Sequence, residues 1–378
     1  MIYEELNVSR ARRTVTATSR LLRALHLDGP LLVLLGLVVA YGLLVLYSAS
    51  GENGSLWTNQ IIRFGIAVVA MTLLAQVPPP WLRMITPWLY AVGVLLLVAV
   101  AVLGDIGKGA QRWLDLGFVR FQPSEMMKLA VPMACAWYAH DRPLPPSFRD
   151  LVVFLLIILV PAGLIAEQPD LGTALLVSVA GGLVVLFAGL QVRYLLGGIT
   201  LAAVAIPVGW HFLHDYQRQR VLTFLDPQTD PLGAGYHIIQ SQIAIGSGGV
   251  FGKGWMRGSQ AQLEFLPERT TDFIFAVVGE ELGLLGQVLL LLLYLAVIGR
   301  ALWMANQCRD TFSRLTAGTL GMTFFIYVFV NAGMVSGLLP VVGVPLPLFS
   351  YGGTSMVTLL AGFGILMALY ANRKLVSS

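Results

Sequence analysis

The sequence predicts an all-α polytopic membrane protein with about ten transmembrane helices. Of its 378 residues, 57% are hydrophobic and only 12% are charged, and the mean hydropathy is +0.77. A soluble domain is typically about 25% charged. Uncharged apolar runs recur along the chain, as expected of helices that satisfy their own backbone hydrogen bonds in lipid. The net charge of +4 is no signal of nucleic-acid binding, because the basic residues are spread over short loops, where they set topology.

The first 28 residues form a basic, polar tail ahead of the first apolar run. That run covers 31–47 and is longer than the core of a signal peptide, which has about 7–15 residues. We therefore expect it to remain as an uncleaved first span, although the small residues at 48–50 resemble a cleavage site. Cys135 lies in a span and Cys308 in a short loop, so they fit neither a disulfide nor a metal site.

Proline and short polar segments delimit the other spans. Pro78, Pro79 and Pro80 end the second span, because three prolines cannot continue a helix. Pro123 suits the first turn of the fourth, and the polar residues at 167–170 separate the fifth from the sixth. The predicted spans are 30–49, 61–77, 86–104, 123–139, 151–166, 171–189, 194–211, 273–299, 315–337 and 350–371.

Ten spans place both termini on the same side of the membrane, and charge indicates which side. With the N-terminus in the cytoplasm, the inner segments hold 14 of the 24 basic residues, as the positive-inside rule requires. One large extracytoplasmic loop, 212–272, then joins spans seven and eight, and the 105–122 loop is also external. The predicted domains are a cytoplasmic tail at 1–28, a ten-helix membrane domain at 29–371 and a cytoplasmic tail at 372–378.

The end of the large loop carries the first candidate for chemistry. Asp272 follows Thr270 and Thr271; if either threonine caps the eighth helix, Asp272 lies in its first turn, where the helix dipole favours a carboxylate. Such a group can act as a general base or only complement the helix terminus. Glu280 and Glu281 lie about 12–14 Å further along a continuous helix. That depth predicts structural residues of the bundle interior or a coupling element.

Glu125 and Lys128 are the second candidate, because they are three apart on one helix face at the same end as Asp272. An unpaired ammonium one to two turns inside the membrane is costly, which favours a pair that lines a cavity. The alternative is an interfacial ion pair with the lysine reaching toward water.

Several basic residues on the outer side do not follow the topology rule. Guanidinium groups at a membrane surface suit phosphate or pyrophosphate, and contact with anionic lipid headgroups is the alternative. These residues are Arg63, Arg112, Arg120, Arg218, Arg220, Lys253, Arg257 and Arg269.

Two further stretches of the chain predict structure rather than chemistry. The Gly-rich run 246–258 lacks the Walker spacing and predicts a flexible loop over a site, and an interfacial helix is expected over 236–245. Segment 331–355 contains Pro340, Pro345 and Pro347, yet it is too apolar for a solvated loop. Non-helical backbone at membrane depth must be buried in protein or line a cavity, so this segment predicts a buried wall.

Segment 331–355 resembles the signature of the SEDS (shape, elongation, division and sporulation) family. LPERTTDFIFAVVGEELG, QPSEMMKLA and EQPDLGTA resemble three further blocks of that family, in the same order. GVPLPLFSYGG and QLEFLPER are more similar to the elongation branch than to the division branch, which often carries lysine at the position of Gln262. The residues that carry the main signature are Asn331, Gly337, Pro340, Gly343, Ser350, Tyr351, Gly352 and Gly353.

The resemblance implies a peptidoglycan glycosyltransferase. It would polymerise lipid II, an undecaprenyl-pyrophosphate disaccharide-pentapeptide, into β-1,4 glycan at the outer face of the bacterial cytoplasmic membrane. Asp272 corresponds to the family's essential aspartate, and Glu125 and Lys128 to its paired glutamate and lysine. The candidates for supporting pyrophosphate binding are Arg63, Arg112, Arg120 and Arg269.

The resemblance also implies partners and limits the cofactors. A class B penicillin-binding protein and other elongation-complex proteins are the expected protein partners, and no nucleic acid is expected. The candidate cofactor is Mg²⁺ or Mn²⁺, with Asp272 or Glu125 as its ligand. No nucleotide or organic cofactor is expected. The alternative functions are a flippase for lipid II and a non-catalytic scaffold for the penicillin-binding protein.

Overall fold

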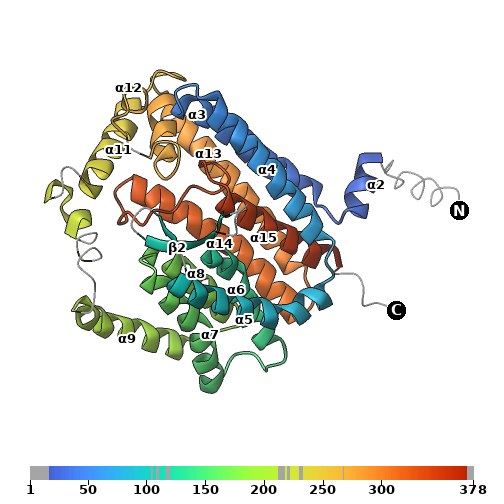
Figure 1. Ribbon diagram of the computed structural model, residues 1–378. Coiled ribbons are helices and arrows are strands. Elements are labelled where there is room, and N and C mark those ends of the chain that lie inside the picture. The colour runs from blue at the N-terminus through green and yellow to red at the C-terminus, as the bar shows by residue number, and fades with distance from the viewer. Residues whose placement is uncertain are drawn as a thin grey trace, which may run out of the picture.

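The computed structural model describes residues 17–103, 105–107, 110–115, 120–211, 218, 222–229, 233–266 and 268–372. These residues form a bundle of long helices, which confirms the helical class (Figure 1). Ten long helices match the ten predicted spans in order. They are α3 (Gly29–Ala49), α4 (Gly54–Ala75), α5 (Pro79–Leu103), α6 (Pro123–His140), α7 (Phe148–Glu167), α8 (Leu171–Phe187), α9 (Val192–Trp210), α13 (Ile274–Asn306), α14 (Thr311–Val335) and α15 (Thr354–Ala371).

Hydropathy agrees with about ten spans. Seven of the described helices are long and apolar enough to cross a membrane, and α8 and part of α9 are apolar but shorter. The tenth, α6, carries Glu125 and Lys128 among otherwise apolar residues. The short α2 (Ala17–Ala24) and the end of α15 lie at the right of Figure 1, consistent with an even number of spans. The predicted tails fall largely outside the described residues.

Short strands and helices lie at the end of the bundle opposite to α2. The strands β1 (Asp105–Gly107), β2 (Ala110–Asp115) and β3 (Arg120–Phe121) form a small antiparallel sheet between α5 and α6, which the all-α prediction did not include. The large loop contains a 3₁₀ turn, η1, and two helices, α11 and α12. Their bounds are Pro227–Thr229, Ala234–Gly248 and Ser259–Gln262, so α11 confirms the predicted helix over 236–245. We call this end, with α11 and α12, the loop end.

The segment between α14 and α15 is a buried wall, as predicted. Val344, Leu346, Leu348 and Phe349 are each at most 4% exposed. Tyr294 of α13 donates a hydrogen bond from its hydroxyl to the carbonyl oxygen of Pro347 at 2.8 Å. The proline-rich backbone is therefore held inside the protein, where its polar groups find partners.

The eighth span does not follow the predicted continuous helix, because α13 breaks at Gly283. That glycine has φ 67° and ψ −164°, a conformation that favours glycine over residues with a Cβ. Glu281 precedes the break and accepts a hydrogen bond from Ser48 Oγ at 2.6 Å, and Ser48 lies at the loop end of α3. Glu280 and Glu281 therefore lie near the loop end of the bundle. Their side chains are 0% and 1% exposed, in agreement with the prediction of structural residues in the bundle interior.

The Gly-rich run is bound tightly to this break. A broken helix leaves main-chain donors and acceptors without helical partners. Lys253 N donates to Glu280 O and Gly254 N donates to Glu281 O, both at 2.9 Å. Across the break, Leu284 N donates to Gly249 O at 2.9 Å and Leu285 N to Val250 O at 3.1 Å. The prediction of a flexible loop here is wrong, because four backbone hydrogen bonds join the run to α13.

This packing leads to a stability prediction for Gly248. A Cβ at Gly248 would overlap the carbonyl oxygen of Gly279, whereas a Cβ at Gly246 would meet no atom within 4 Å. We expect Gly248→Ala to lower the free energy of unfolding by about 1–3 kcal/mol, as overpacking does. The control, Gly246→Ala in the same helix, should be neutral or stabilising, because alanine is the better helix former. Thermal unfolding of both variants in one detergent measures the difference, and equal midpoints would contradict the packing argument.

Candidate active site

The main chain around Asp272 is held by residues of the buried wall. Ser350 Oγ donates to Thr271 O at 2.5 Å, and Tyr351 N donates to Thr270 O at 2.8 Å. Asn331 Nδ2 of α14 donates to the carbonyl oxygen of Asp272 at 2.8 Å. The predicted threonine cap is absent from α13, whose N-cap is Phe273 without a side-chain hydrogen bond. Asp272 therefore precedes the helix instead of occupying its first turn, and long-range hydrogen bonds fix it.

Asn331 joins two segments that flank the Asp272 carboxylate. Its amide also donates to Val344 O at 2.7 Å, and its side chain is fully buried. Oδ2 of Asp272 is 3.6 Å from the position that a Cβ on Gly343 would take. Gly343 has φ 71°, so glycine both permits this turn and leaves room beside the carboxylate.

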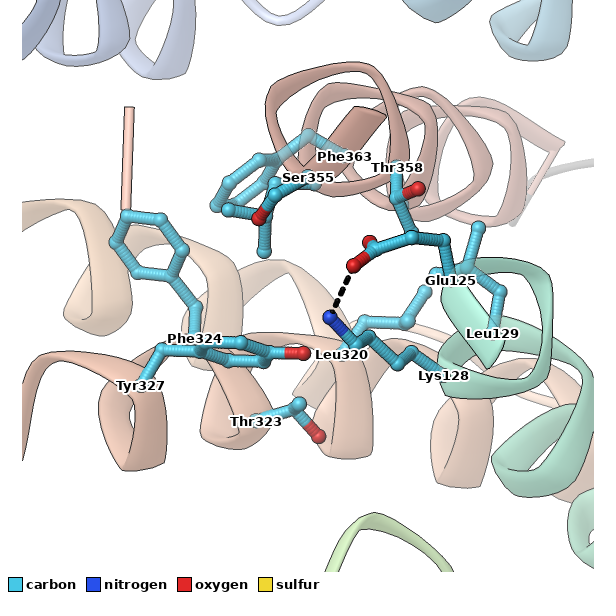
Figure 2. A pocket seen from close by; sticks show the side chains of 12 residues that line it. Glu125, Lys128, Leu129, Leu320, Thr323, Phe324, Tyr327, Ser355, Thr358 and Phe363 are labelled. Carbon is cyan, nitrogen blue, oxygen red and sulfur yellow. Dashed lines mark hydrogen bonds and ion pairs between the residues drawn. The ribbon is translucent and has the colours of Figure 1, made fainter. Parts of the chain in front are cut away.

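The Glu125–Lys128 pair is buried as predicted. Lys128 Nζ lies 2.6 Å from Glu125 Oε1, and the two side chains are 8% and 9% exposed, which argues against a lysine that reaches out to water. The ammonium also lies 5.3 Å from the ring centroid of Tyr327 on α14. Figure 2 shows these groups facing one cavity. Thr323, Ser355 and Thr358 line it together with apolar side chains.

The helix α14 brings the two candidates together. Asn331, which holds Asp272, and Tyr327, which lies over Lys128, are four residues apart on this helix and so share a face. Four residues correspond to about 6 Å along the axis. Val344, which is hydrogen-bonded to Asn331, packs against Tyr327. The helix α14 therefore links Asp272 to Glu125 and Lys128, which the sequence predicts to lie at the same end of the bundle.

Two residues of this region were not singled out from the sequence. Tyr327 lies in a run of apolar residues, so no local sequence pattern indicates a role in a site. Asp170 caps α8 by accepting from Thr173 N at 3.3 Å, and it also accepts from Gln122 Nε2 at 3.2 Å. A carboxylate in EQPDLGTA was visible, but the pairing with Gln122 at the start of α6 depends on the fold.

The structure separates the predicted arginines into different environments. Arg63 of α4 lies 4.6 Å over the ring of Tyr351, beside Gly353. Gln60, also on α4, donates a hydrogen bond to Ser350 O and accepts one from Gly352 N. The helix α4 therefore holds the turn formed by residues 350–353 in place. This arrangement places Arg63 next to the segment that holds Asp272.

Other predicted basic residues make contacts elsewhere or fall outside the described side chains. Arg269 donates from Nε to Ala49 O at 2.7 Å and from Nη2 to Glu264 at 2.9 Å, so its guanidinium anchors the loop to the end of α3. Lys253 pairs with Glu280 at 2.7 Å. Arg112 lies on β2 and Arg120 on β3, and their side chains are outside the described part.

The described residues do not assemble a metal site by themselves. Within the described ranges, no three His, Cys, Asp or Glu side chains are grouped in a way that could hold a metal ion. Cys135 and Cys308 are buried, and no disulfide joins them. Glu125 Oε2 is buried without a hydrogen-bond partner among the described groups, but a single oxygen is far short of the coordination shell of Mg²⁺.

Asn331 provides a direct test of how the site is held. We expect Asn331→Ala and Asn331→Asp to slow the reaction at Asp272 similarly, because neither side chain can donate to both carbonyl groups. Asn331→Gln keeps the amide and should retain more activity than either. Initial rates with purified variants of matched thermal stability measure the effect. Full activity in the Asp variant would show that the two donated hydrogen bonds are dispensable.

Comparison with known proteins shows the relatives of this chain. Residues 24–375 match the family model FTSW_RODA_SPOVE, described as cell cycle protein. The chain is 53% identical to the peptidoglycan glycosyltransferase MrdB of Escherichia coli K12, over 93% of this chain and 95% of that protein. It is 37% identical to the probable peptidoglycan glycosyltransferase FtsW of Trichlorobacter lovleyi, over 91% and 94% of the two chains.

Solved structures show the same fold. A chain from a study of how a peptidoglycan synthase complex coordinates polymerization and crosslinking matches with a TM-score of 0.81 and 34% identity, over 92% of this chain and 98% of that chain. The rod shape determining protein RodA of Thermus thermophilus matches with a TM-score of 0.70 and 32% identity, over 92% and 97%.

Proposed function

This chain belongs to the FTSW_RODA_SPOVE family and is a peptidoglycan glycosyltransferase, and we propose that its reaction takes place between Asp272 and the Glu125–Lys128 pair. The observation that carries this placement is their convergence on one face of α14, through Asn331 and Tyr327. A carboxylate and a buried ammonium, held next to residues one helical turn apart on α14, suit a reaction that removes a proton from one group and neutralises charge on another.

The elongation branch is the better match, as the sequence motifs predicted. Identity is 53% to the E. coli MrdB protein and 37% to the FtsW protein, at similar coverage. The chain therefore acts in cell elongation and the maintenance of rod shape. Its multiple apolar helices fit a multi-pass protein of the bacterial inner membrane.

The proposed reaction joins two lipid II molecules or a growing glycan and lipid II. Asp272 takes the proton of a sugar 4-hydroxyl, whose oxygen then bonds to the anomeric carbon of the other sugar. The bond from that carbon to the pyrophosphate oxygen breaks, and attack opposite the α-linked leaving group gives a β-1,4 linkage. Lys128 and Arg63 neutralise the departing pyrophosphate, with Arg112 and Arg120 as further candidates. The buried Glu125 holds Lys128 in place.

We propose that this site faces the outside of the membrane. The support is the charge rule, because the loops at the end opposite to Asp272 are rich in arginine, among them Arg83, Arg142, Arg193 and Arg309. We also propose a class B penicillin-binding protein as partner, together with other proteins of the elongation complex. The support is the similarity to a chain of a synthase complex that couples polymerization to crosslinking.

We propose separately that a divalent cation takes part in the reaction. The described side chains do not form a metal site without further ligands. Asp272 would then be a ligand for Mg²⁺ or Mn²⁺, together with oxygen atoms of the pyrophosphate. Polymerisation measured with and without a chelator, and with either metal restored, distinguishes this role from that of a base.

Reconstituted protein with its partner in vesicles that contain fluorescent lipid II tests the proposed function. We expect glycan polymer that a muramidase degrades. Movement of lipid II across the bilayer without polymer would favour a flippase. The position of the candidate polar residues at one end of the bundle, rather than at the membrane midplane, argues against that function. Polymer from the partner alone, at the same rate, would favour a scaffold.

A further inference from the structure

The Gly-rich run exposes apolar side chains in a loop that the sequence assigned to the aqueous side. Val250 is 52% exposed, Phe251 79% and Trp255 44%. Exposed apolar side chains that lie close together usually mark an interaction surface. The depth of this loop along the bundle therefore decides what its apolar side chains contact.

Trp255 gives the depth of the loop. Its indole Nε1 donates to the carbonyl oxygen of Leu44 at 3.2 Å. Leu44 is five residues before the end of α3, which corresponds to about 7.5 Å along the helix. The loop thus descends beside α3 instead of rising above its end.

A cluster of aromatic rings from α3, α4 and the loop lies at this same depth along α3. The ring of Tyr47 lies between Trp57 and Trp255, with centroid distances of 6.2 and 6.1 Å. Trp57 belongs to the span α4 and donates to Leu43 O at 3.2 Å, one residue from the acceptor of Trp255. Tryptophan and tyrosine are enriched at the boundary between headgroups and acyl chains. Trp255 therefore lies where a membrane-spanning helix places its own interfacial tryptophan.

Backbone inside a membrane needs partners within the protein for its polar groups, and several main-chain groups of the loop have such partners. Gly249 O and Val250 O accept from α13, and Lys253 N and Gly254 N donate to it. Gly252 N donates to Gly248 O at 2.8 Å. The Lys253 ammonium is neutralised by the buried Glu280 at 2.7 Å.

From these contacts we infer that residues 249–256 form a re-entrant loop whose apolar tip, Val250 and Phe251, lies among the acyl chains of the adjacent leaflet. The tip continues the apolar surface of the neighbouring spans, because Leu284 and Leu285, bound to it through their amides, are 54% and 53% exposed. Lipid is therefore the occupant of this surface. The loop is hydrogen-bonded to the same helical segment, 274–282, that follows Asp272, so its depth sets the level of Asp272 relative to the headgroups.

Fluorescence quenching at single cysteines tests the depth. Cys135 and Cys308 are replaced by alanine, and one cysteine at Phe251, Glu52 or Leu289 carries a bimane label. The protein is reconstituted in phosphatidylethanolamine–phosphatidylglycerol vesicles that contain lipids with a nitroxide on the acyl chain. Glu52 is an exposed residue in the turn between α3 and α4, and Leu289 lies 53% exposed on α13, so they serve as aqueous and lipid-facing references.

We expect the label at Phe251→Cys to behave like that at Leu289→Cys, with strong quenching by the nitroxide lipid and little by aqueous iodide. Glu52→Cys should show the reverse. If Phe251→Cys disturbs folding, Val250→Cys reports on the same tip. Quenching at both tip positions that matches Glu52→Cys would overturn the inference. The same holds if the label at the tip is shielded from both quenchers, because a protein surface would then be covering it.

Discussion

Asp272→Asn should reduce glycan polymerisation by about 10²–10⁴-fold, the range associated with loss of a general base. The substitution keeps the shape of the side chain but removes the group that accepts the proton. The main chain at this position is fixed by Asn331 and Ser350 from distant segments, so the variant should retain the wild-type arrangement. Initial rates of polymer formation from labelled lipid II, with partner present, measure the effect.

The control for this prediction is a neighbouring carboxylate. Glu268 is exposed and accepts a hydrogen bond from Thr271 Oγ1 at 2.8 Å, which a glutamine oxygen can also accept. Glu268→Gln should therefore polymerise at about the rate of the wild type. Both variants should co-purify with the partner and unfold at the wild-type temperature. A wild-type rate from Asp272→Asn would remove the catalytic role from this residue.

Lys128→Met is expected to have the second largest effect, on stability and activity together. Removing one partner of a buried ion pair typically costs 3–5 kcal/mol, about the range we expect here, because it leaves the other charge unpaired. Glu125 is only 7% exposed and its other oxygen has no partner among the described groups, so the penalty cannot be relieved by solvent. Polymerisation should also fall by about 10²–10³-fold through loss of positive charge near the leaving group.

A double substitution separates the two effects. In Lys128→Met with Glu125→Met, no buried charge is left unpaired, so the thermal midpoint should recover toward that of the wild type. Polymerisation should remain at the level of the single variant, because the positive charge is still missing. Recovery of activity together with stability would mean that the pair only supports the fold, and that Arg63 or another arginine neutralises the pyrophosphate.

Much of the fold follows from local properties of the chain. Apolar runs, prolines and short polar segments place all ten long helices, because a helix in lipid must satisfy its own backbone hydrogen bonds. The Glu125–Lys128 contact is equally local, since residues three apart on a helix face one another. The buried wall before α15 was predictable because proline-rich apolar backbone has no stable place in lipid or in water.

The break in α13 shows where local reasoning fails. The run from Ile274 onward is helical in composition, and Gly283 alone does not predict that the chain turns there. The break is stable because the Gly-rich run supplies donors and acceptors to both sides of it, and that pairing joins segments about thirty residues apart. Gly248 and Gly252 allow the run to approach the backbone of α13 closely. From the sequence alone, the same glycines indicate a flexible loop.

The sequence by itself determined the membrane class, the spans and the candidate carboxylate and lysine, because hydropathy and helical spacing are encoded over a few residues. Only the tertiary structure decided that Asp272 precedes its helix, that Tyr327 lies over Lys128, and that Arg269 anchors a loop to α3. These features depend on hydrogen bonds and packing between segments far apart in the chain. Such contacts form only when the helices are assembled, so no local pattern records them.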